Sequence, residues 1–492
     1  MLLQSLKLAG LVAIGLPASS LGRTISKRSV SSAQAWMTSN DGTYQLANYT
    51  APVQGSGSGS GISSTWNLSV DDSSSGHKQT IDGFGGTITH STPAVTDATV
   101  TVFSELSSDQ QTALLNDLFT STTASGASFN LMRHTIASSD LSSSVYTYDD
   151  ASNADTSLSS WDLTSAGTSM ISWISKFASA SGSLKLLGSC WSPPGWMKLN
   201  GVTSGSTNNN NLNTDYADAY AEYFVKYIQA FANGGVNVDA ITIQNEPLNS
   251  QSGYPTMYLD ADSATSLIQN NVGPALAKAG LKTEIWAYDH NTDVPSYPQT
   301  VLNGAGSYVS NVAWHCYAQN NNWSALTDFH NTNPDATQYM TECWTSPTNS
   351  WYSTIDFTMG PLQNWAAGVI AWTLGTDTNY SPHLSGGCST CRGIVTVDTS
   401  SGSYSKTADY YWLAQFSRFL PRGSIALSTG GSYDYGNGDK VEAQAFVQPD
   451  GTRVVVIQNG FNNAVEVTVA FSSGETWSGP LYSQSLTTWL LP

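Results

Sequence analysis

The chain of 492 residues is long enough to bury a large core, as two or three domains or as one α/β barrel with an appendage. It has 36 acidic and 18 basic side chains, a net charge of -18 without long runs of one sign. Nucleic acids and anionic membrane surfaces are recognised by basic patches, so this balance argues against both as partners.

Residues 1–20 have the pattern of a secretory signal peptide. Lys7 precedes an apolar run from Leu8 to Leu16, and small residues follow. No later stretch reaches about 18 apolar residues, so we expect a secreted, soluble protein. Lys27 and Arg28 then form either a second processing site, which would make residues 21–28 a pro-segment, or an incidental pair of charges.

Export permits disulfides and N-glycans. Cys388 and Cys391 predict a loop disulfide in place of a redox or zinc motif, because no second CxxC or paired histidine follows. Five cysteines cannot all pair, so at least one of Cys190, Cys316 and Cys343 should be free and buried. Four asparagines begin glycosylation sequons: Asn48, Asn67, Asn322 and Asn379.

Residues 31–75 alternate short polar and aromatic pieces around a Gly/Ser turn at 55–61. They predict one or two strands, too few to fold alone.

Residues 76–420 contain eight apolar runs that predict strands: Gly83–Thr89, Phe129–Arg133, Leu184–Ser189, Ala240–Gln244, Thr283–Tyr288, Val312–Cys316, Gln338–Thr341 and Gly368–Leu374. Amphipathic segments between them predict helices at Asp109–Leu118, Ser169–Ala178, Tyr216–Ala232 and Ala264–Ala279. Eight strands alternating with helices is the count for a (β/α)8 TIM barrel. An open doubly wound sheet is the rival, weakened because no glycine-rich phosphate loop follows the first strand.

Residues 421–492 lack a helical pattern. Their alternation predicts antiparallel strands at Val441–Val447, Thr452–Gln458, Ala464–Phe471 and Ser485–Leu491. We expect a small antiparallel β-sandwich, completed by the strands of residues 31–75.

Two glutamates stand at the ends of predicted strands. Glu246 follows the fourth strand and Glu342 ends the seventh, and parallel barrel strands gather their C-terminal ends at one face. A pair of carboxylates is what glycoside hydrolysis needs, one to protonate the leaving oxygen and one to face the anomeric carbon. A lone glutamate is usually a solvated surface acid. Charged residues make up only 11% of this chain, however, so this ordinary role is less expected for two glutamates at strand ends.

Aromatic and polar residues accompany the other strand ends. The 16 tryptophans and 23 tyrosines suit carbohydrate, whose C–H faces stack on aromatic rings, or equally a large aromatic core. At or just after the ends of strands two, three, five, six and eight lie Arg133 and Asp140, Trp191, Asp289 and His290, His315 and Tyr317, and Trp372.

The sequence resembles glycoside hydrolase family 30 in four stretches: Ile81–Gly86, Trp191–Lys198, Asn245–Pro247 and Thr341–Glu342. The resemblance runs from about residue 79 to the C-terminus, and residues 244–259 look like the branch of fungal endo-β-1,6-glucanases. One departure is Cys190, where family members usually have proline before the Trp-Ser-Pro run.

This resemblance implies a barrel and β-sandwich hydrolase that acts with retention, with Glu246 as acid/base and Glu342 as nucleophile. It also implies that Asn245 holds the sugar 2-hydroxyl, and that the first subsite is lined by Arg133, Asp140, Trp191, His315 and Trp372.

The chemistry sets further expectations for these residues. The two carboxyl groups should stand about 5 to 5.5 Å apart. Glu342 should stay ionised, aided by Arg133 and Tyr317, whereas Glu246 needs a raised pKa. Two carboxylates need no ion, and the histidines lack metal-binding spacing, so we expect no metal and no cofactor. We expect Lys198 to be peripheral.

We therefore expect a secreted, monomeric, retaining endo-β-1,6-glucanase that hydrolyses the β-1,6-glucan of cell walls. One alternative is another β-glycosidase of the family, acting on glucosylceramide, β-1,6-galactan or xylan. The other is a non-catalytic wall-binding protein, which would need at least one of the glutamates lost; both are present.

Overall fold

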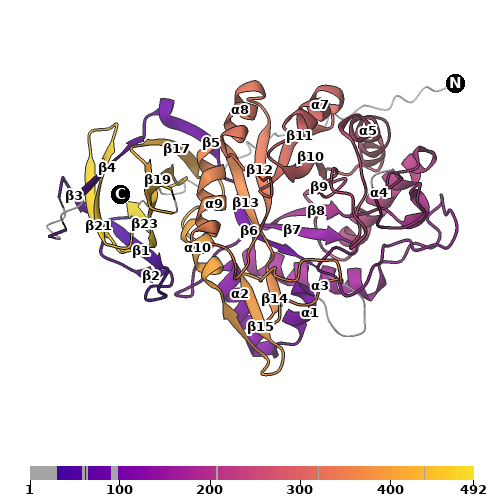
Figure 1. Ribbon diagram of the computed structural model, residues 1–492, viewed down its shortest axis with the longest axis horizontal. Coiled ribbons are helices and arrows are strands. Elements are labelled where there is room, and N and C mark those ends of the chain that lie inside the picture. The colour runs from indigo at the N-terminus through magenta and orange to yellow at the C-terminus, as the bar shows by residue number, and fades with distance from the viewer. Residues whose placement is uncertain are drawn as a thin grey trace, which may run out of the picture.

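The computed structural model describes residues 30–57, 61–62, 65–89, 98–206, 209–319, 321–436 and 438–492. The leader expected at 1–20 and the pro-segment expected at 21–28 lie outside these ranges. The described chain forms a closed barrel with a β-sandwich beside it (Figure 1). None of its helices is both long and apolar enough to cross a bilayer.

The barrel consists of eight parallel strands that pair in chain order, with the last one closing onto the first. This closure excludes the open doubly wound sheet, and the eight predicted strands are confirmed. They are β6 (Gly83–Ile88), β7 (Leu131–Ile136), β8 (Lys185–Cys190), β9 (Ala240–Thr242), β10 (Glu284–Asn291), β11 (Val309–His315), β12 (Thr337–Trp344) and β13 (Ala366–Trp372).

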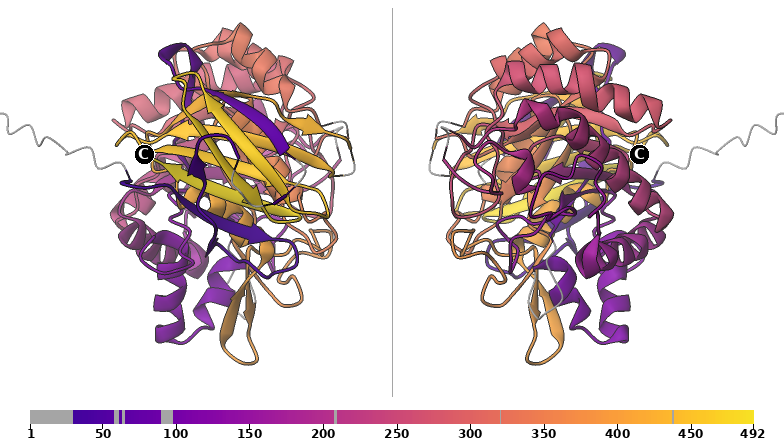
Figure 2. Two further views of the ribbon diagram at one scale, coloured as in Figure 1. Left: turned by 90° about the vertical axis from the view of Figure 1, so that its left-hand side faces the viewer. Right: turned by 90° about the vertical axis from the view of Figure 1, so that its right-hand side faces the viewer.

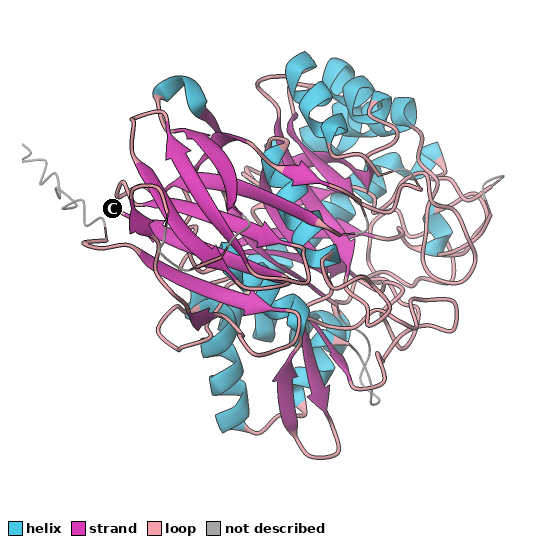
Figure 3. Cartoon of the chain, turned by 60° about the vertical axis from the view of Figure 1, so that its left-hand side comes forward, coloured by secondary structure: helices cyan, strands magenta, loops and turns pink. Residues whose placement is uncertain are grey.

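Helices cover the outside of the barrel (Figure 3). In α4 (Ala217–Asn233), for example, buried Tyr220, Phe224 and Ile228 recur at the four-residue spacing of one helix face. The helix predicted over 264–279 is interrupted by one π-helical turn at 268–272. The remaining helices are α1 (Thr99–Ser104), α2 (Ser108–Phe119), α3 (Thr164–Ser181), α5 (Ala261–Leu267), α6 (Gly273–Lys278), α7 (Ser296–Ala305), α8 (Ser324–Thr332), α9 (Ser353–Gln363) and α10 (Ala408–Ser417).

Side chains fill the barrel interior. The ring of Trp286 stacks on that of Tyr339 at 3.9 Å, and the Tyr339 hydroxyl donates to Asp82, which also pairs with Lys185 at 2.7 Å. Gly85 lies so close to β7 that a Cβ there would collide with the carbonyl oxygen of Leu131. Because the interior is packed, a ligand must bind at the strand ends.

The β-sandwich is built from both ends of the chain (Figure 2). Its strands are β1 (Gln34–Ser39), β2 (Ala47–Asn48), β3 (Val53–Gln54), β4 (Thr65–Asp71), β5 (His77–Thr80), β17 (Ile425–Gly430), β18 (Tyr433–Asp434), β19 (Lys440–Val447), β20 (Arg453–Asn459), β21 (Val465–Phe471), β22 (Thr476–Leu481) and β23 (Ser485–Leu491). One layer runs β2-β1-β23-β20-β19-β17 and the other β4-β21-β22-β3. The expected sandwich of N- and C-terminal strands is confirmed, except that β4 and β21 pair in parallel.

A small sheet that the sequence analysis did not predict follows the last barrel strand. It contains β14 (Gly375–Asp377), β15 (Val395–Asp398) and β16 (Ser403–Lys406), and β15 projects at the bottom of Figure 1. The long loop between β14 and β15, residues 378–394, carries both Cys388 and Cys391.

Candidate active site

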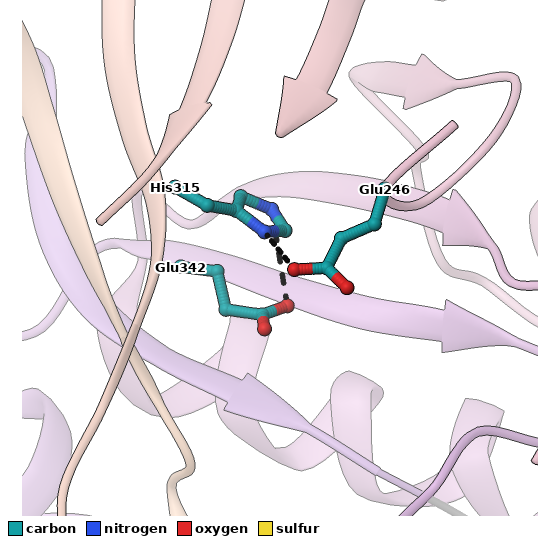
Figure 4. A group of neighbouring side chains, drawn as sticks. All are labelled: Glu246, His315 and Glu342. Atoms are coloured by element: carbon teal, nitrogen blue, oxygen red, sulfur yellow. Dashed lines mark hydrogen bonds and ion pairs between the residues drawn. The ribbon is translucent and has the colours of Figure 1, made fainter. Parts of the chain in front are cut away.

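Glu246 and Glu342 converge at the C-terminal ends of the barrel strands. Glu246 lies in the loop after β9, in left-handed backbone with φ 44°, and Glu342 lies within β12. Strained backbone of this kind is concentrated at functional sites. A carboxylate oxygen of Glu246 lies within 4.8 Å of one of Glu342 (Figure 4). This proximity suits a retaining pair, whose carboxyl groups stand about 5 to 5.5 Å apart.

Arg133, on β7, anchors the floor of this site. Its side chain is fully buried and donates from Nη1 to Oε2 of Glu342 at 2.7 Å. Nη2 donates to Oδ1 of Asn245 at 2.6 Å and to Oδ2 of Asp289 at 2.9 Å. The Trp191 ring covers the guanidinium at 4.8 Å. One cation thus fixes groups from three other strand ends, and its buried charge is compensated.

His315, at the end of β11, bridges Glu246 and Asp289. Its Nδ1 lies 3.2 Å from Oε1 of Glu246, and its Nε2 lies 2.9 Å from Oδ1 of Asp289. Burial lowers the pKa of His315, but the charges of Glu342 and Asp289 outweigh it and raise the pKa to about 9. The ring is therefore an imidazolium at neutral pH and donates both hydrogen bonds.

The acidities of the two glutamates differ from the expectation. Burial raises the pKa of Glu246, but the hydrogen bond from His315 and the nearby charges of His290 and His315 outweigh it and hold the pKa at about 2. Burial raises the pKa of Glu342, although His315 and Arg133 oppose this. The prediction of a raised pKa for Glu246 is wrong for the unliganded protein, because His315 holds the proton instead.

Both glutamates have further hydrogen-bond partners. The Tyr317 hydroxyl donates to Oε1 of Glu342 at 3.0 Å. Oε2 of Glu246 accepts from Nδ2 of Asn249 at 2.7 Å, and the same amide donates to the Tyr254 hydroxyl at 3.0 Å. Asn249 and Tyr254 were not among the site residues predicted from the sequence. Both lie in the stretch that resembles fungal endo-β-1,6-glucanases, but in a loop beyond the strand end.

A cavity of about 220 Å³ opens beside the two carboxylates. It is lined by Asp140, Trp191, Asn245, Glu246, Tyr254, Tyr317, Glu342, Trp344, Trp372, Cys388 and Cys391. Five of the seven residues predicted to bind substrate line this cavity, namely Asp140, Trp191, Asn245, Tyr317 and Trp372. The other two, Arg133 and His315, lie buried behind the glutamates. A larger hollow of about 580 Å³, lined by residues between 147 and 164, shares none of these residues.

Asp140 forms part of the cavity wall with the loop between β14 and β15. Its Oδ2 accepts a hydrogen bond from the backbone N–H of Cys388 at 3.3 Å, whereas its buried Oδ1 has no partner within the described protein. Burial, reinforced by the charge of Glu342, raises the pKa of Asp140 to about 7. A buried acceptor without a partner is suited to a ligand hydroxyl.

The structure also places the five cysteines, Lys198 and the sequon asparagines. Cys388 and Cys391 form the expected disulfide, a second disulfide links Cys316 to Cys343, and Cys190 is free and buried. The expectation for Lys198 is wrong: it is 4% exposed and donates to the carbonyl oxygen of Thr256 at 2.6 Å. The sequon asparagines Asn48, Asn67, Asn322 and Asn379 are exposed.

Glu246, His315 and Glu342 are also close enough to offer three ligands to a metal ion. Their electrostatics oppose one, because the Arg133 guanidinium already neutralises Glu342 and a protonated His315 has no lone pair to donate. The donor set favours proton transfer over metal binding.

Comparisons with known proteins agree with this geometry. The chain matches the models of the glycosyl hydrolase family 30 TIM-barrel domain over residues 81–420 and of the family's beta sandwich domain over residues 424–489. An endo-1,6-beta-D-glucanase of Aspergillus fumigatus is 56% identical over 97% of this chain and 98% of its own, and one of Neurospora crassa is 55% identical over 93% and 95%. The mouse lysosomal acid glucosylceramidase is 30% identical over 80% and 77%. The solved structure of an endo-beta1,6-glucanase superposes with a TM-score of 0.79 at 26% identity, covering 94% of this chain and 99% of the other.

Proposed function

Because the chain belongs to glycoside hydrolase family 30, we propose that it is a secreted, retaining endo-β-1,6-glucanase that acts on β-1,6-glucan. The observation that carries this proposal is that a carboxylate oxygen of Glu246 lies within 4.8 Å of one of Glu342. The linkage and the endo mode rest on the relatives of more than 50% identity that bear this activity in their names.

In the first step, a carboxylate oxygen of Glu342 attacks the anomeric carbon of the glucose held in the cavity. The bond to the glycosidic oxygen breaks, and that oxygen leaves as the 6-hydroxyl of the next glucose with a proton from Glu246, which receives it in turn from His315 at 3.2 Å. Arg133 and Tyr317 hold the carboxylate of Glu342 in place through hydrogen bonds of 2.7 and 3.0 Å. The product of this step is a glucosyl ester on Glu342.

In the second step, Glu246 takes a proton from a water molecule, whose oxygen attacks the anomeric carbon and releases Glu342. Two inversions give net retention. Asn245, which Arg133 orients at 2.6 Å, would hold the sugar 2-hydroxyl. Asp140, with its free oxygen, would accept from other hydroxyls, and Trp191 and Trp372 would provide the ring platform.

The transferable proton belongs to the pair formed by Glu246 and His315. In the unliganded protein it resides on the imidazole, 3.2 Å from Oε1 of Glu246. When Glu342 becomes an ester, the largest charge that raises the pKa of His315 disappears. The pKa of His315 then falls. His315 therefore competes less strongly with Glu246 for the proton of the incoming water.

The test is hydrolysis of linear β-1,6-, β-1,3- and β-1,4-glucans with the products sized. Long β-1,6-oligosaccharides released early, with the β-anomer seen first by NMR, are the expected result. Glucose alone from the start, or activity confined to another linkage, contradicts the proposal. The roles are separated by azide rescue on an aryl glucoside, with alanine variants that leave room for the azide: Glu246→Ala should give a β-azide and Glu342→Ala an α-azide. Glu222→Ala, at an exposed glutamate of α4, is the matched control.

Secretion and glycosylation are part of the proposal. They are supported by the leader expected at residues 1–20, the two disulfides and four exposed sequon asparagines. Intact mass of the protein from the culture medium, before and after enzymatic removal of N-glycans, tests both. A protein retained in the cell, or an unchanged mass, would contradict the respective part.

A further inference from the structure

Tyr433 and Tyr435 present exposed aromatic rings on the β-sandwich. They are 56% and 64% exposed, whereas every other tryptophan, tyrosine and phenylalanine of the described residues is at least partly buried. Adjacent exposed rings on a protein that otherwise covers its aromatic residues indicate an interaction surface.

The two rings stand nearly parallel to each other, edge-on to a partly buried aromatic base. Their centroids lie 6.2 Å apart with planes only 18° from parallel. Trp66 supports both, at 5.4 Å from Tyr433 and 6.1 Å from Tyr435, and Phe461 stacks on Trp66 at 5.6 Å. We call Tyr433 and Tyr435 the tyrosine platform. Because Trp66 packs against the sandwich core, the platform has a rigid base.

The charge around the platform selects a neutral partner. Asp434 lies between the two tyrosines, Asp439 follows in the same hairpin, and the whole chain carries a net charge of -18. These charges repel nucleic acids and anionic membranes. A pyranose presents uncharged C–H groups to an aromatic face and hydroxyls to its edge, which two near-parallel phenol rings match.

The platform belongs to a hairpin that contacts the barrel. Gly438, in the turn after Tyr435, packs directly against the ring of Tyr352, and β19 lies beside α9 (Figure 1). Tyr352 directly precedes α9, the helix that follows β12, and β12 carries Glu342. The hairpin therefore contacts the barrel in the segment that follows a catalytic strand.

We propose that the tyrosine platform is a second glucan-binding site, separate from the catalytic cavity, that holds insoluble polymer beside the barrel. The class of ligand, a neutral glucan, follows from the ring chemistry and charge. Its assignment as β-1,6-glucan rests on the proposed function.

The test measures binding to insoluble β-1,6-glucan and hydrolysis of short soluble β-1,6-oligosaccharides by the same proteins. Tyr433→Leu with Tyr435→Leu keeps an apolar cover over Trp66 but removes the flat rings. We expect binding to weaken about tenfold, since each stacked ring contributes modestly, while hydrolysis of the short substrates changes less than about twofold. Tyr433→Phe with Tyr435→Phe keeps the rings and should retain binding.

The matched control is Tyr44→Leu with Tyr482→Leu, a half-buried tyrosine pair elsewhere in the sandwich. Unchanged polymer binding in the platform variant, or an equal loss in the control, overturns the proposal. A wild-type dimer that the platform variant converts to a monomer also overturns it, because a second copy would then be the occupant. If the double leucine variant does not fold, Tyr435→Ala alone gives the same comparison at the more exposed ring. Absence of hydrolysis in every protein would instead contradict the proposed function and leave the binding comparison readable.

Discussion

Asp140 lines the cavity, and its buried carboxyl group lowers the stability of the folded protein. Its carboxyl group is buried against the loop between β14 and β15, and one oxygen has no partner among the described residues. Such a group is retained for function against stability. A pocket that must bind hydroxyls needs an unpaired acceptor before the substrate arrives.

Replacing Asp140 with asparagine should separate these two effects. The folded pKa of Asp140 is about 7 against an ordinary 3.8, so its carboxyl makes folding less favourable as pH rises from about 4 to 7, by about 4 kcal/mol in total. Asp140→Asn should therefore unfold at higher denaturant at pH 7, match the wild type near pH 4, and lose activity. Urea unfolding at several pH values measures this. Asp335→Asn, at an exposed position, is the control, and a variant less stable than the wild type at pH 7 would contradict the account.

His315 gives the opposite dependence on pH. Its folded pKa of about 9 exceeds the ordinary 6.5, so its ion pairs stabilise the protein fully below pH 6.5, and this contribution, about 3 kcal/mol, is lost as pH rises through 9. In His315→Gln the free energy of unfolding should fall less between pH 6.5 and 9 than in the wild type. Calorimetry across this range is the measurement, with exposed His77→Gln as the control. If stability changed with pH in the same way in the wild type and in His315→Gln, the positive charge assigned to His315 would be refuted.

The sequence predicted which residues form the site better than it predicted their protonation states. Position at a strand end was enough to select Arg133, Glu246 and Glu342, because parallel strands deliver their ends to one place. The location of the proton depends on a contact between His315 and Glu246, which come from different strands and share no local pattern. That information exists only in the folded arrangement.

The loop between β14 and β15 matters to the cavity more than to the fold. Its disulfide, between Cys388 and Cys391, closes only a three-residue separation, and a bridge this short constrains the unfolded chain little. Yet the backbone N–H of Cys388 donates to Asp140, and that of Leu384 donates to the Asp140 carbonyl at 2.8 Å. The bridge therefore lies in the loop that supplies two hydrogen bonds to Asp140, and we expect it to affect substrate binding through this residue.

Opening this bridge should impair binding selectively. Cys388→Ser with Cys391→Ser is expected to raise KM about tenfold, as loss of positioning at one buried hydrogen bond costs about 1 kcal/mol or more, while Tm stays close to the wild type. Steady-state kinetics and a thermal scan measure the two quantities. Cys190→Ala, at the free buried thiol, is the control. A large fall in Tm with an unchanged KM would show a structural role instead.

Element prediction succeeded where one periodic pattern dominated. All eight barrel strands are short apolar runs between amphipathic helices, and local sequence specifies both. β22 was missed because Gly479 and Pro480 are unfavourable in strands, and its pairing with β21 overrides that preference. The sheet of β14 to β16 was missed because its strands are only three or four residues long.

The barrel and the sandwich are joined through buried polar contacts as well as apolar ones. Gln415 of α10 donates to the Thr38 hydroxyl of β1 at 2.9 Å and accepts from that of Thr488, on β23, at 2.7 Å. The backbone of Ile81, before the first barrel strand, bonds with Ser424 at 2.7 Å. Both parts should therefore unfold together.

A calorimetric scan should accordingly show one transition for the whole chain. Gln415→Ala should lower Tm and keep the transition single, since the buried Thr38 hydroxyl loses its donor at a cost of roughly 1 kcal/mol or more, while Thr488 keeps the backbone carbonyl of residue 415 as an acceptor. Gln229→Ala, on the exposed face of α4, should change stability by less than about 0.5 kcal/mol. Two resolved transitions, in the wild type or in Gln415→Ala, would mean that the sandwich and the barrel are independent units.

The pairing of β1 with β23 places Gln34 opposite Leu490, and so ties the first described strand to the last. During synthesis β1 can pair only with β2, and its partner β23 emerges when nearly the whole polypeptide has been made. A nascent or truncated chain that lacks β23 cannot complete the layer that contains β1, and Gln415 of α10 then lacks its partner Thr488. Maturation is thereby coupled to the completion of translation, so that a fragment carrying both glutamates but ending before residue 485 should be a target for degradation rather than an active hydrolase.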